Sequence, residues 1–439
     1  MVDQGLAGWI ARQSQTAVAN MLLSVSAAGL VKHRAGFGQT IVPAKGSVVA
    51  SPVPASYDPD PDYFFHWYRD SAVVMDALRL VGTAAACAHF CDFVAFSLGL
   101  DRREGRGLIA DPHWRDAVAP DLAQYLRDDA ELAAVDIRGE TRVNPDGSLD
   151  ILRWSRPQHD GIAARALTVL RWVAGCGSFG AEHDRAIARL LTEDLRFVLA
   201  HWREPSFDLW EEEKAHHYYT LRLQGAALEH GAVWLQQRGD TDAARAARAG
   251  ATEIMRRLDD YWLPRAGYYR SRLGGDASAP KNLDIAVILA AIHAGGSGAH
   301  SPADARMLAT LGRLDALFAA EYAINRARPP GRGPALGRYT GDTYYSGGAY
   351  YFSTLGAAEF CFRRACTLEP GPAAVALVAR GDAYLETVRA YTPENGAMAE
   401  QFDQTSGAQS SARHLAWSYA AFISAAAARH QARGRSVKY

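Results

Sequence analysis

The chain has 439 residues, of which 49% are hydrophobic and 22% are charged, the usual composition of a globular protein. Its formal net charge is −1, so it lacks the basic surface with which proteins bind nucleic acids or anionic lipids. No run approaches the roughly 18 apolar residues of a membrane span, so we expect neither nucleic acid nor a membrane as a partner.

The N-terminal segment, residues 1–15, contains Asp3, Arg12 and three glutamines, and it lacks the apolar core of a secretory signal. The five cysteines form an odd, scattered set without disulfide-framework or zinc-site spacing. These features predict a soluble, cytoplasmic protein with reduced thiols, without a bound metal or cofactor.

Helical periodicity dominates the chain. Apolar residues recur at steps of three and four over residues 221–235, which predicts a helix. A second helix is predicted to begin with Ser301 as its N-cap, Pro302 in the first helical position and Asp304 in the first turn. An Ala-rich helix is predicted over residues 412–433. Alternating strand patterns are short and few, and the best of them is residues 46–53.

Between the predicted helices lie six loops that combine Gly or Pro with aromatic and charged residues. They are residues 58–70, 153–161, 207–217, 267–282, 337–351 and 393–403. Each interval is long enough for two helices of ordinary length. Six helical hairpins that deliver one loop each to the same end predict an all-α ring, an (α/α)6 barrel, with a pocket formed by the loops. No linker divides the chain, so we expect one domain over residues 1–439.

Residues 207–217, FDLWEEEKAHH, place several carboxylates beside Trp210. By charge alone such a cluster is typical of a helix start, where acidic side chains complement the helix dipole. Glycoside hydrolysis, however, requires one carboxylic acid and a second carboxylate on opposite sides of the scissile bond. Glu211 is the candidate acid, because burial beside Trp210 would raise its pKa. Glu400, between small residues, is the candidate base.

Two other interpretations of charged segments are weaker. Adjacent His216 and His217 would point about 100° apart on a helix and would chelate a metal poorly. Asp58, Asp60 and Asp62 alternate with prolines and lack the later Glu of a calcium loop. We therefore predict no metal site.

Five motifs, in chain order, resemble those of glycoside hydrolase family 15, the glucoamylases. They are PDYFFHWYRDSA, RPQHDG, DLWEE, GRYTGDTYYSGGAYY and AEQFD. The resemblance runs along nearly the whole chain, and it is to the fungal-type catalytic domain without a starch-binding domain. It implies an inverting exo-hydrolase that releases β-D-glucose from the non-reducing ends of α-glucan oligosaccharides such as malto-oligosaccharides.

The resemblance also implies roles for particular residues. Glu211 would be the general acid and Glu400 the general base. The implied substrate-binding residues are Tyr63, Trp67, Arg69, Asp70, Trp154, Trp210, Glu212, Arg338, Tyr345 and Tyr350. The implied supporting residues are Asp208, Asp342, Gln401 and Ser411. We expect a monomer without cofactors.

Two departures from the family pattern concern the leaving-group side. Tyr350 stands where a Trp is usual, and Lys214 replaces a neutral residue, and both changes predict weaker binding of outer sugars. Two alternatives remain open. One is the same mechanism with α-1,6 (isomaltose) or trehalose specificity, and the other is a non-catalytic glycan-binding protein.

Overall fold

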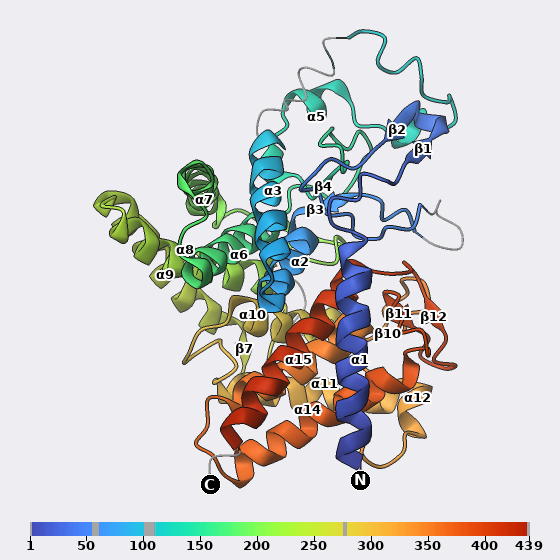
Figure 1. The fold of residues 1–439 in the computed structure, drawn as a ribbon, viewed down its shortest axis with the longest axis vertical. Helices are drawn as coiled ribbons and strands as arrows, with labels where there is room; N and C mark the ends of the chain where they lie inside the picture. Colours follow the sequence, from blue (N-terminus) through green and yellow to red (C-terminus); the bar gives the residue numbers. More distant parts are fainter. Residues whose placement is uncertain (1, 55–60, 101–108, 110, 275–278, 437–439) are drawn as a thin grey trace.

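The computed structural model describes residues 2–54, 61–100, 109, 111–274 and 279–436. Six of its helices form an inner ring: α2 (Tyr68–Val81), α6 (Asp160–Cys176), α8 (Tyr218–Gln237), α10 (Ala286–Ala294), α13 (Tyr351–Ala365) and α15 (Ala416–Ser436). Each packs against the next, and α15 packs against α2, so the ring of these described helices is complete. Figure 1 shows their arrangement.

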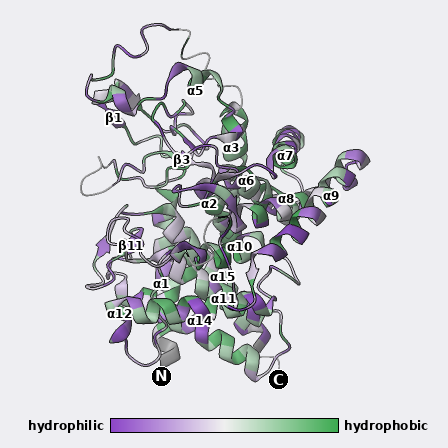
Figure 2. Cartoon of the chain, turned by 180° about the vertical axis from the view of Figure 1, so that it is seen from behind, coloured by the Kyte–Doolittle hydropathy of each residue, from purple (hydrophilic) through white to green (hydrophobic). Residues whose placement is uncertain are grey.

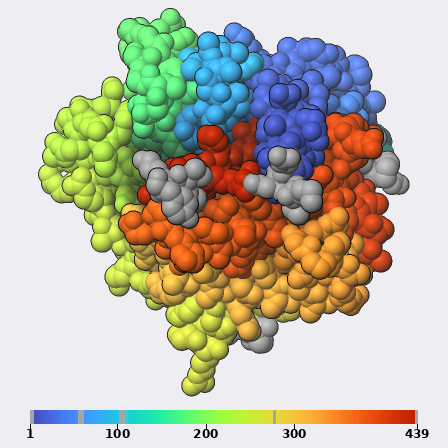
Figure 3. Space-filling model, turned by 60° about the horizontal axis from the view of Figure 1, so that its bottom comes forward, coloured from blue at the N-terminus to red at the C-terminus, as the bar shows by residue number. Residues whose placement is uncertain are grey.

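A second set of helices covers the ring from outside. It consists of α1 (Val2–Leu22), α3 (Ala84–Leu100), α7 (Ala181–His201), α9 (Thr241–Leu258), α11 (Ala305–Glu321) and α14 (Pro372–Tyr391). Each outer helix contacts the inner helix beside it in the chain, except that α1 packs on α15, where Trp9 meets Phe422 edge-on at 5.4 Å. In Figure 3 the red C-terminal part accordingly lies between the blue N-terminal and orange segments. The predicted six-hairpin, all-α ring is confirmed.

Burial separates the two sets of helices. Residues 160–170 of α6 and 218–228 of α8 are buried in unbroken runs, because neighbours surround each inner helix. On α9 only one face is buried, through residues such as Ala244, Ala247 and Ile254 at helical spacing. Hydrophilic and hydrophobic residues accordingly alternate along α9 in Figure 2. None of the described helices combines the length and the apolarity needed to cross a membrane.

Short strands organise the loops. The antiparallel sheets are β1 (Lys32–Arg34) with β2 (Gln39–Ile41), β3 (His66–Trp67) with β4 (Arg142–Val143), β7 (Trp262–Leu263) with β8 (Tyr268–Tyr269), and two three-stranded sheets. The latter are β5 (Ser206–Phe207), β6 (Lys214–His217) and β9 (Arg272–Leu273), and β10 (Ala349–Tyr350), β11 (Gln401–Phe402) and β12 (Gln409–Ser410). The short helices α5 (Asp129–Ala133) and α12 (Ala323–Arg326) lie in connections.

Several local predictions need correction. Helix α11 begins at Ala305 with Asp304 as its N-cap, because the Asp304 carboxylate, not Ser301, accepts from the first-turn amide of Arg306. The Ala-rich helix begins at Ala416, later than predicted. Residues 46–53 form no strand; Val48 makes an isolated bridge with Val25, and the amides of Ala50 and Ser51 donate to the carbonyl oxygens of Phe65 and Tyr63. The predicted helix over residues 221–235 lies within α8 and is confirmed.

Two further predictions concern charged segments. The acidic segment after Phe207 does not begin a helix but forms the turn between β5 and β6. His216 and His217 lie in β6, where successive side chains point to opposite faces. Of the three aspartates considered for calcium, Asp58 and Asp60 lie outside the described residues. The five cysteines form no disulfide.

Candidate active site

A pocket of about 260 Å³ opens where the predicted loops meet. Five of the six loops contribute to its lining, and the sixth, residues 267–282, reaches its rim through Lys281. The lining residues are Ala50, Tyr63, Trp67, Arg69, Asp70, Trp154, Leu209, Trp210, Glu211, Glu212, Arg338, Tyr344, Tyr350, Phe352, Glu400, Leu415 and Trp417. The pocket therefore contains both predicted catalytic glutamates.

The turn between β5 and β6 presents Glu211. Asp208 shapes this turn, because its carboxylate accepts the backbone N–H groups of Glu212 (2.8 Å) and Glu213 (3.0 Å). Glu211 has a φ of 66°, in the left-handed region that side chains other than Gly rarely adopt. Such strain persists only where the surroundings enforce it, and it is concentrated at functional sites.

Three N–H groups converge on the Glu211 carboxylate. Trp67 Nε1 donates to Oε1 at 2.8 Å, Arg69 reaches the same oxygen at 3.3 Å, and Trp154 Nε1 donates to Oε2. The Ser155 hydroxyl donates to the Glu211 carbonyl oxygen at 2.5 Å. The side chain is thus held in one orientation.

Glu400 lies in a more enclosed environment. The register of β11 and β12 pairs Gln401 with Ser410, so the next residues outward, Glu400 and Ser411, are also adjacent. The Ser411 hydroxyl donates to Glu400 Oε2 at 2.5 Å, and the Tyr63 hydroxyl lies 3.3 Å from both carboxylate oxygens. Burial raises the pKa of Glu400 to about 7, although the Ser411 hydrogen bond lowers it. This carboxyl group can therefore exchange a proton near neutral pH.

An aromatic pair connects the two glutamates. The rings of Tyr63 and Trp67 lie 5.3 Å apart, centroid to centroid. Through its ring nitrogen Trp67 holds Glu211, and through its hydroxyl Tyr63 contacts Glu400. The two carboxyl groups are thereby positioned in the same pocket by one rigid wall.

Arg69 and Asp70 lie in the first turn of α2, deep in the pocket. The Arg69 guanidinium pairs with Asp70 (3.2 Å) and with Asp160 at the start of α6 (3.3 Å). Gly161 permits this approach, because a Cβ there would lie only 2.6 Å from the Cβ of Tyr68. Burial raises the pKa of Asp70 to about 6, against the lowering effect of Arg69. Paired donors and acceptors of this kind suit vicinal sugar hydroxyls.

A second charged group lies around Glu212 and Arg338. Arg338 forms two hydrogen bonds with Asp342, at 2.6 and 2.5 Å, and an ion pair with Glu212 at 2.8 Å. Lys281 Nζ and the Tyr339 hydroxyl both reach Glu212 Oε2 at 2.5 Å. Glu212 is therefore oriented by three donors, Arg338, Lys281 and Tyr339.

Trp210 is fixed on both its edge and its face. Its Nε1 donates to Asp284 at 2.8 Å, and its ring stacks on Phe352 with centroids 6.0 Å apart. Its other aromatic neighbour is Tyr350. The ring offers the pocket an apolar surface of the kind that packs on sugars.

The structure gives the predicted binding residues Tyr350, Tyr345 and Trp154 different degrees of exposure. Tyr350 lines the pocket but is only 1% exposed, and its hydroxyl donates to Asp342 and accepts from Gln401, so little of its ring is available to stack on a sugar. Tyr345 is 41% exposed and does not line the pocket, and its ring packs edge-on against that of Tyr344 at 4.8 Å. Trp154, at 38%, is the most exposed of the aromatic side chains that line the pocket.

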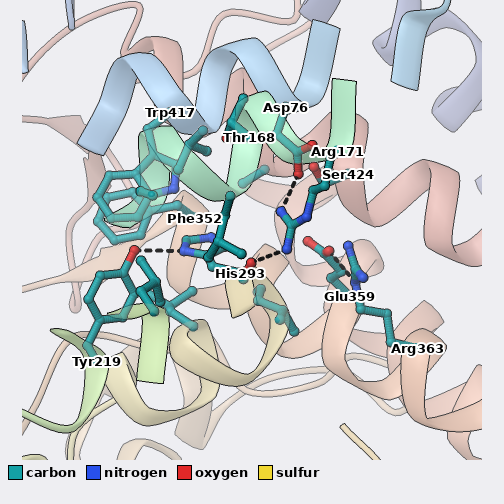
Figure 4. Close-up of a pocket in the computed structure, with 18 residues that line it drawn as sticks. Asp76, Thr168, Arg171, Tyr219, His293, Phe352, Glu359, Arg363, Trp417 and Ser424 are labelled. Atoms are coloured by element: carbon teal, nitrogen blue, oxygen red, sulfur yellow. Dashed lines mark hydrogen bonds and ion pairs between the residues drawn. The ribbon is translucent and has the colours of Figure 1, made fainter. Parts of the chain in front are cut away.

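A smaller cavity of about 40 Å³ lies inside the ring beneath this pocket (Figure 4). Phe352 and Trp417, stacked at 4.3 Å, line both spaces and separate them. Around the smaller cavity Asp76 pairs with Arg171, and Tyr219 contacts His293. Its volume suffices for water but not for a sugar ring. The upper pocket is therefore the candidate active site, and it is closed at its inner end.

Several residues at the site were missed by the sequence analysis. They are Ser155, Asp160, Lys281, Asp284, Tyr339, Phe352, Leu415 and Trp417. Four of the eight, Ser155, Asp160, Tyr339 and Phe352, lie within or directly beside the motifs already noted, whereas Trp417 lies in the first turn of α15. The helical pattern of this segment predicts that Trp417 is buried, but it does not predict which cavity the side chain faces.

Glycoside hydrolases use a pair of carboxyl groups that face one pocket, and Glu211 and Glu400 form such a pair. The sequence model of glycosyl hydrolases family 15 matches residues 35–98, 139–370 and 369–427, and the chain belongs to this family. The predicted family resemblance is confirmed.

Known relatives and structures agree with this membership. Glucoamylase P of Amorphotheca resinae is 29% identical over 86% of this chain and 64% of its own length. The probable glucoamylase of Schizosaccharomyces pombe is 26% identical over 97% of this chain and 92% of its own length. The structure of Hormoconis resinae glucoamylase superposes with a TM-score of 0.76 at 26% identity, over 99% of this chain and 74% of that one. The chain spans 64% to 69% of the length of four of the curated relatives it matches.

Proposed function

We propose that the protein hydrolyses α-glucosidic bonds at the non-reducing ends of oligosaccharides and releases β-D-glucose with inversion. The observation that carries this proposal is the pair of glutamates in one pocket, with Glu211 held by three N–H groups and Glu400 held by hydroxyl groups. Glucoamylases among the relatives of the chain support the substrate class.

In the proposed reaction Glu211 donates a proton to the glycosidic oxygen, and Glu400 accepts a proton from the attacking water. The N–H groups of Trp67, Arg69 and Trp154 then stabilise the negative charge left on Glu211. The hydroxyl groups of Tyr63 and Ser411 can orient the water beside Glu400. Arg69 and Asp70 would bind hydroxyl groups of the terminal sugar.

The shape of the pocket supports cleavage at chain ends. The stacked Phe352 and Trp417 close its inner end, so a glycan cannot pass through. With Tyr350 buried, the sequence-based argument for weak outer subsites no longer rests on that residue. Trp154 at the rim is our candidate contact for the sugar beyond the cleaved bond.

The compartment and the assembly state belong to the same proposal. We propose an intracellular monomer with one catalytic domain that acts on oligosaccharides. The five unpaired cysteines support this compartment. The sporulation-specific glucoamylase of Saccharomyces cerevisiae, a relative 25% identical to this chain, is described as intracellular.

One experiment tests linkage and stereochemistry together. Proton NMR should follow glucose release from maltose, isomaltose, trehalose and maltoheptaose. We expect the α-1,4-linked substrates to react fastest and β-glucose to appear before mutarotation, because a base that activates water delivers it from the face opposite the leaving group.

Each other outcome has a defined meaning. If isomaltose or trehalose reacts faster than maltose, the proposed α-1,4 preference is wrong but the proposed mechanism is unaffected. With maltoheptaose, from which the terminal glucose is at first the only monosaccharide released, early α-glucose would contradict inversion. Sugar binding without any glucose release would favour a non-catalytic glycan-binding protein.

Ser411→Ala should shift the acidic limb of the kcat/KM–pH profile to higher pH. Glu400 must be ionised to act as a base, and the Ser411 hydrogen bond lowers its pKa. Loss of one hydrogen bond corresponds to about 0.5 to 1 pH unit. Activity at pH 5 should therefore fall more than activity at pH 8. If the acidic limb does not move, the group that titrates there is not Glu400 but another group, such as Asp70, whose pKa burial raises to about 6.

A further inference from the structure

Three potential metal ligands meet where the start of α6 lies beside the end of α7, and none of them lines the sugar pocket. His159 immediately precedes α6, His201 is the last residue of α7, and Glu204 follows in the connection to β5. Because α6 and α7 pack as an antiparallel hairpin, the start of the first helix lies beside the end of the second. Residues far apart in the sequence therefore become neighbours.

The distances between these side chains suit one shared ion. One ring nitrogen of each histidine and one carboxylate oxygen of Glu204 all lie within 4.8 Å of one another. His201 Nδ1 is 3.0 Å from Glu204 Oε2, and the two imidazole rings are 5.5 Å apart. The Phe197 ring packs against both imidazole rings.

A second observation points to a ligand here. His159 is only 2% exposed, and within the described residues its buried Nδ1 has no hydrogen-bond partner. A buried polar atom without a partner costs free energy, and most such atoms in folded proteins are satisfied.

The chemistry of the three side chains selects the class of ion. Two imidazoles and one carboxylate form a frequent ligand set for Zn²⁺, with water in the fourth position. Mg²⁺ and Ca²⁺ prefer sites made entirely of oxygen atoms. We propose that His159, His201 and Glu204 bind one divalent transition-metal ion of the Zn²⁺ type.

Such an ion would connect two segments that support the catalytic turn. Next to His159, the Gln158 side chain donates to the Asp208 carbonyl oxygen at 2.7 Å. The Phe207 amide, shortly after Glu204, donates to the Pro157 carbonyl oxygen at 2.9 Å. Metal binding should therefore slow amide hydrogen exchange in residues 204–213, where β5 leads into the turn that carries Glu211.

The test is titration of the metal-free, full-length protein with Zn²⁺ by calorimetry, for the wild type and for His201→Ala and Glu204→Gln. We expect each variant to lose one bound ion or to bind it at least about tenfold more weakly. Zn²⁺ should raise the Tm of the wild type more than that of either variant, because it binds the folded state. Excess Mg²⁺ should not compete.

A matched control is available in His113→Ala. His113 and Asp116 form the same i,i+3 pair at 2.9 Å, but within the described part of the chain no third ligand joins them. This variant should bind Zn²⁺ as the wild type does, and any binding to cysteines should be common to all four proteins. The side chains of His201 and Glu204 are 31% and 55% exposed, so both variants should fold, which circular dichroism checks. Equal Zn²⁺ binding by the wild type and both variants, or none by the wild type, would overturn the proposal.

Discussion

Glu211→Gln is expected to lower kcat on maltose by about 10²- to 10⁴-fold, the usual cost of losing a general acid. The amide has nearly the same shape as the carboxyl group but cannot protonate the leaving oxygen. Substrate binding should change less than kcat, because Asp70 and Arg338 remain in place. Steady-state kinetics on maltose measures both quantities.

The control for this variant lies in the same turn. Glu213 pairs with Arg272 and does not line the pocket, so Glu213→Gln should keep kcat within about threefold of the wild type, as expected for loss of a partly exposed ion pair. If Glu211→Gln behaves like this control, Glu211 is not the acid. If both variants lose activity equally, the turn as a whole is disturbed.

Glu400→Gln should also lower kcat by about 10²- to 10⁴-fold, and it should change the pH dependence as well. Burial raises the pKa of Glu400 to about 7, so the wild-type base becomes ionised, and kcat/KM rises, as the pH increases through that value. A Gln at this position does not titrate. The residual activity of the variant should therefore lack this limb in a kcat/KM–pH profile.

Comparing Glu400→Gln with Ser411→Ala distinguishes loss of the base itself from loss of a contact to the base. Ser411 contacts Glu400 directly, and its loss should move the limb, whereas Glu400→Gln should remove it. A Glu400→Gln variant that keeps both the limb and a near-normal kcat would assign the base to another residue. Thermal unfolding of both variants establishes that the fold is retained.

Much of the site could be predicted because its residues lie in short, dense motifs. The segments around Arg69, Trp154, Glu211, Arg338 and Glu400 are rich in aromatic and charged residues, and all five of these residues line the pocket. Helices such as α8 could also be predicted, because apolar residues at helical spacing mark the face of a helix that is buried.

The boundaries and the individual roles were less predictable. The choice between Ser301 and Asp304 as N-cap depends on which side chain reaches the amide of Arg306. Tyr350 and Tyr345 occupy one loop and have similar sequence contexts, yet one is buried and the other is exposed. Such differences depend on packing against β11 and Trp210, which local sequence does not encode.

The sequence by itself determined the alternation of helices and polar loops, the family resemblance and the two candidate glutamates, because these are properties of contiguous residues. Only the tertiary structure decided that Lys281 orients Glu212, that burial raises the pKa of Glu400 to about 7, and that His159 meets His201 and Glu204. The physical reason is that charge pairing, desolvation and metal ligation depend on distances of a few ångströms between segments far apart in the chain. Closure of the helical ring sets those distances.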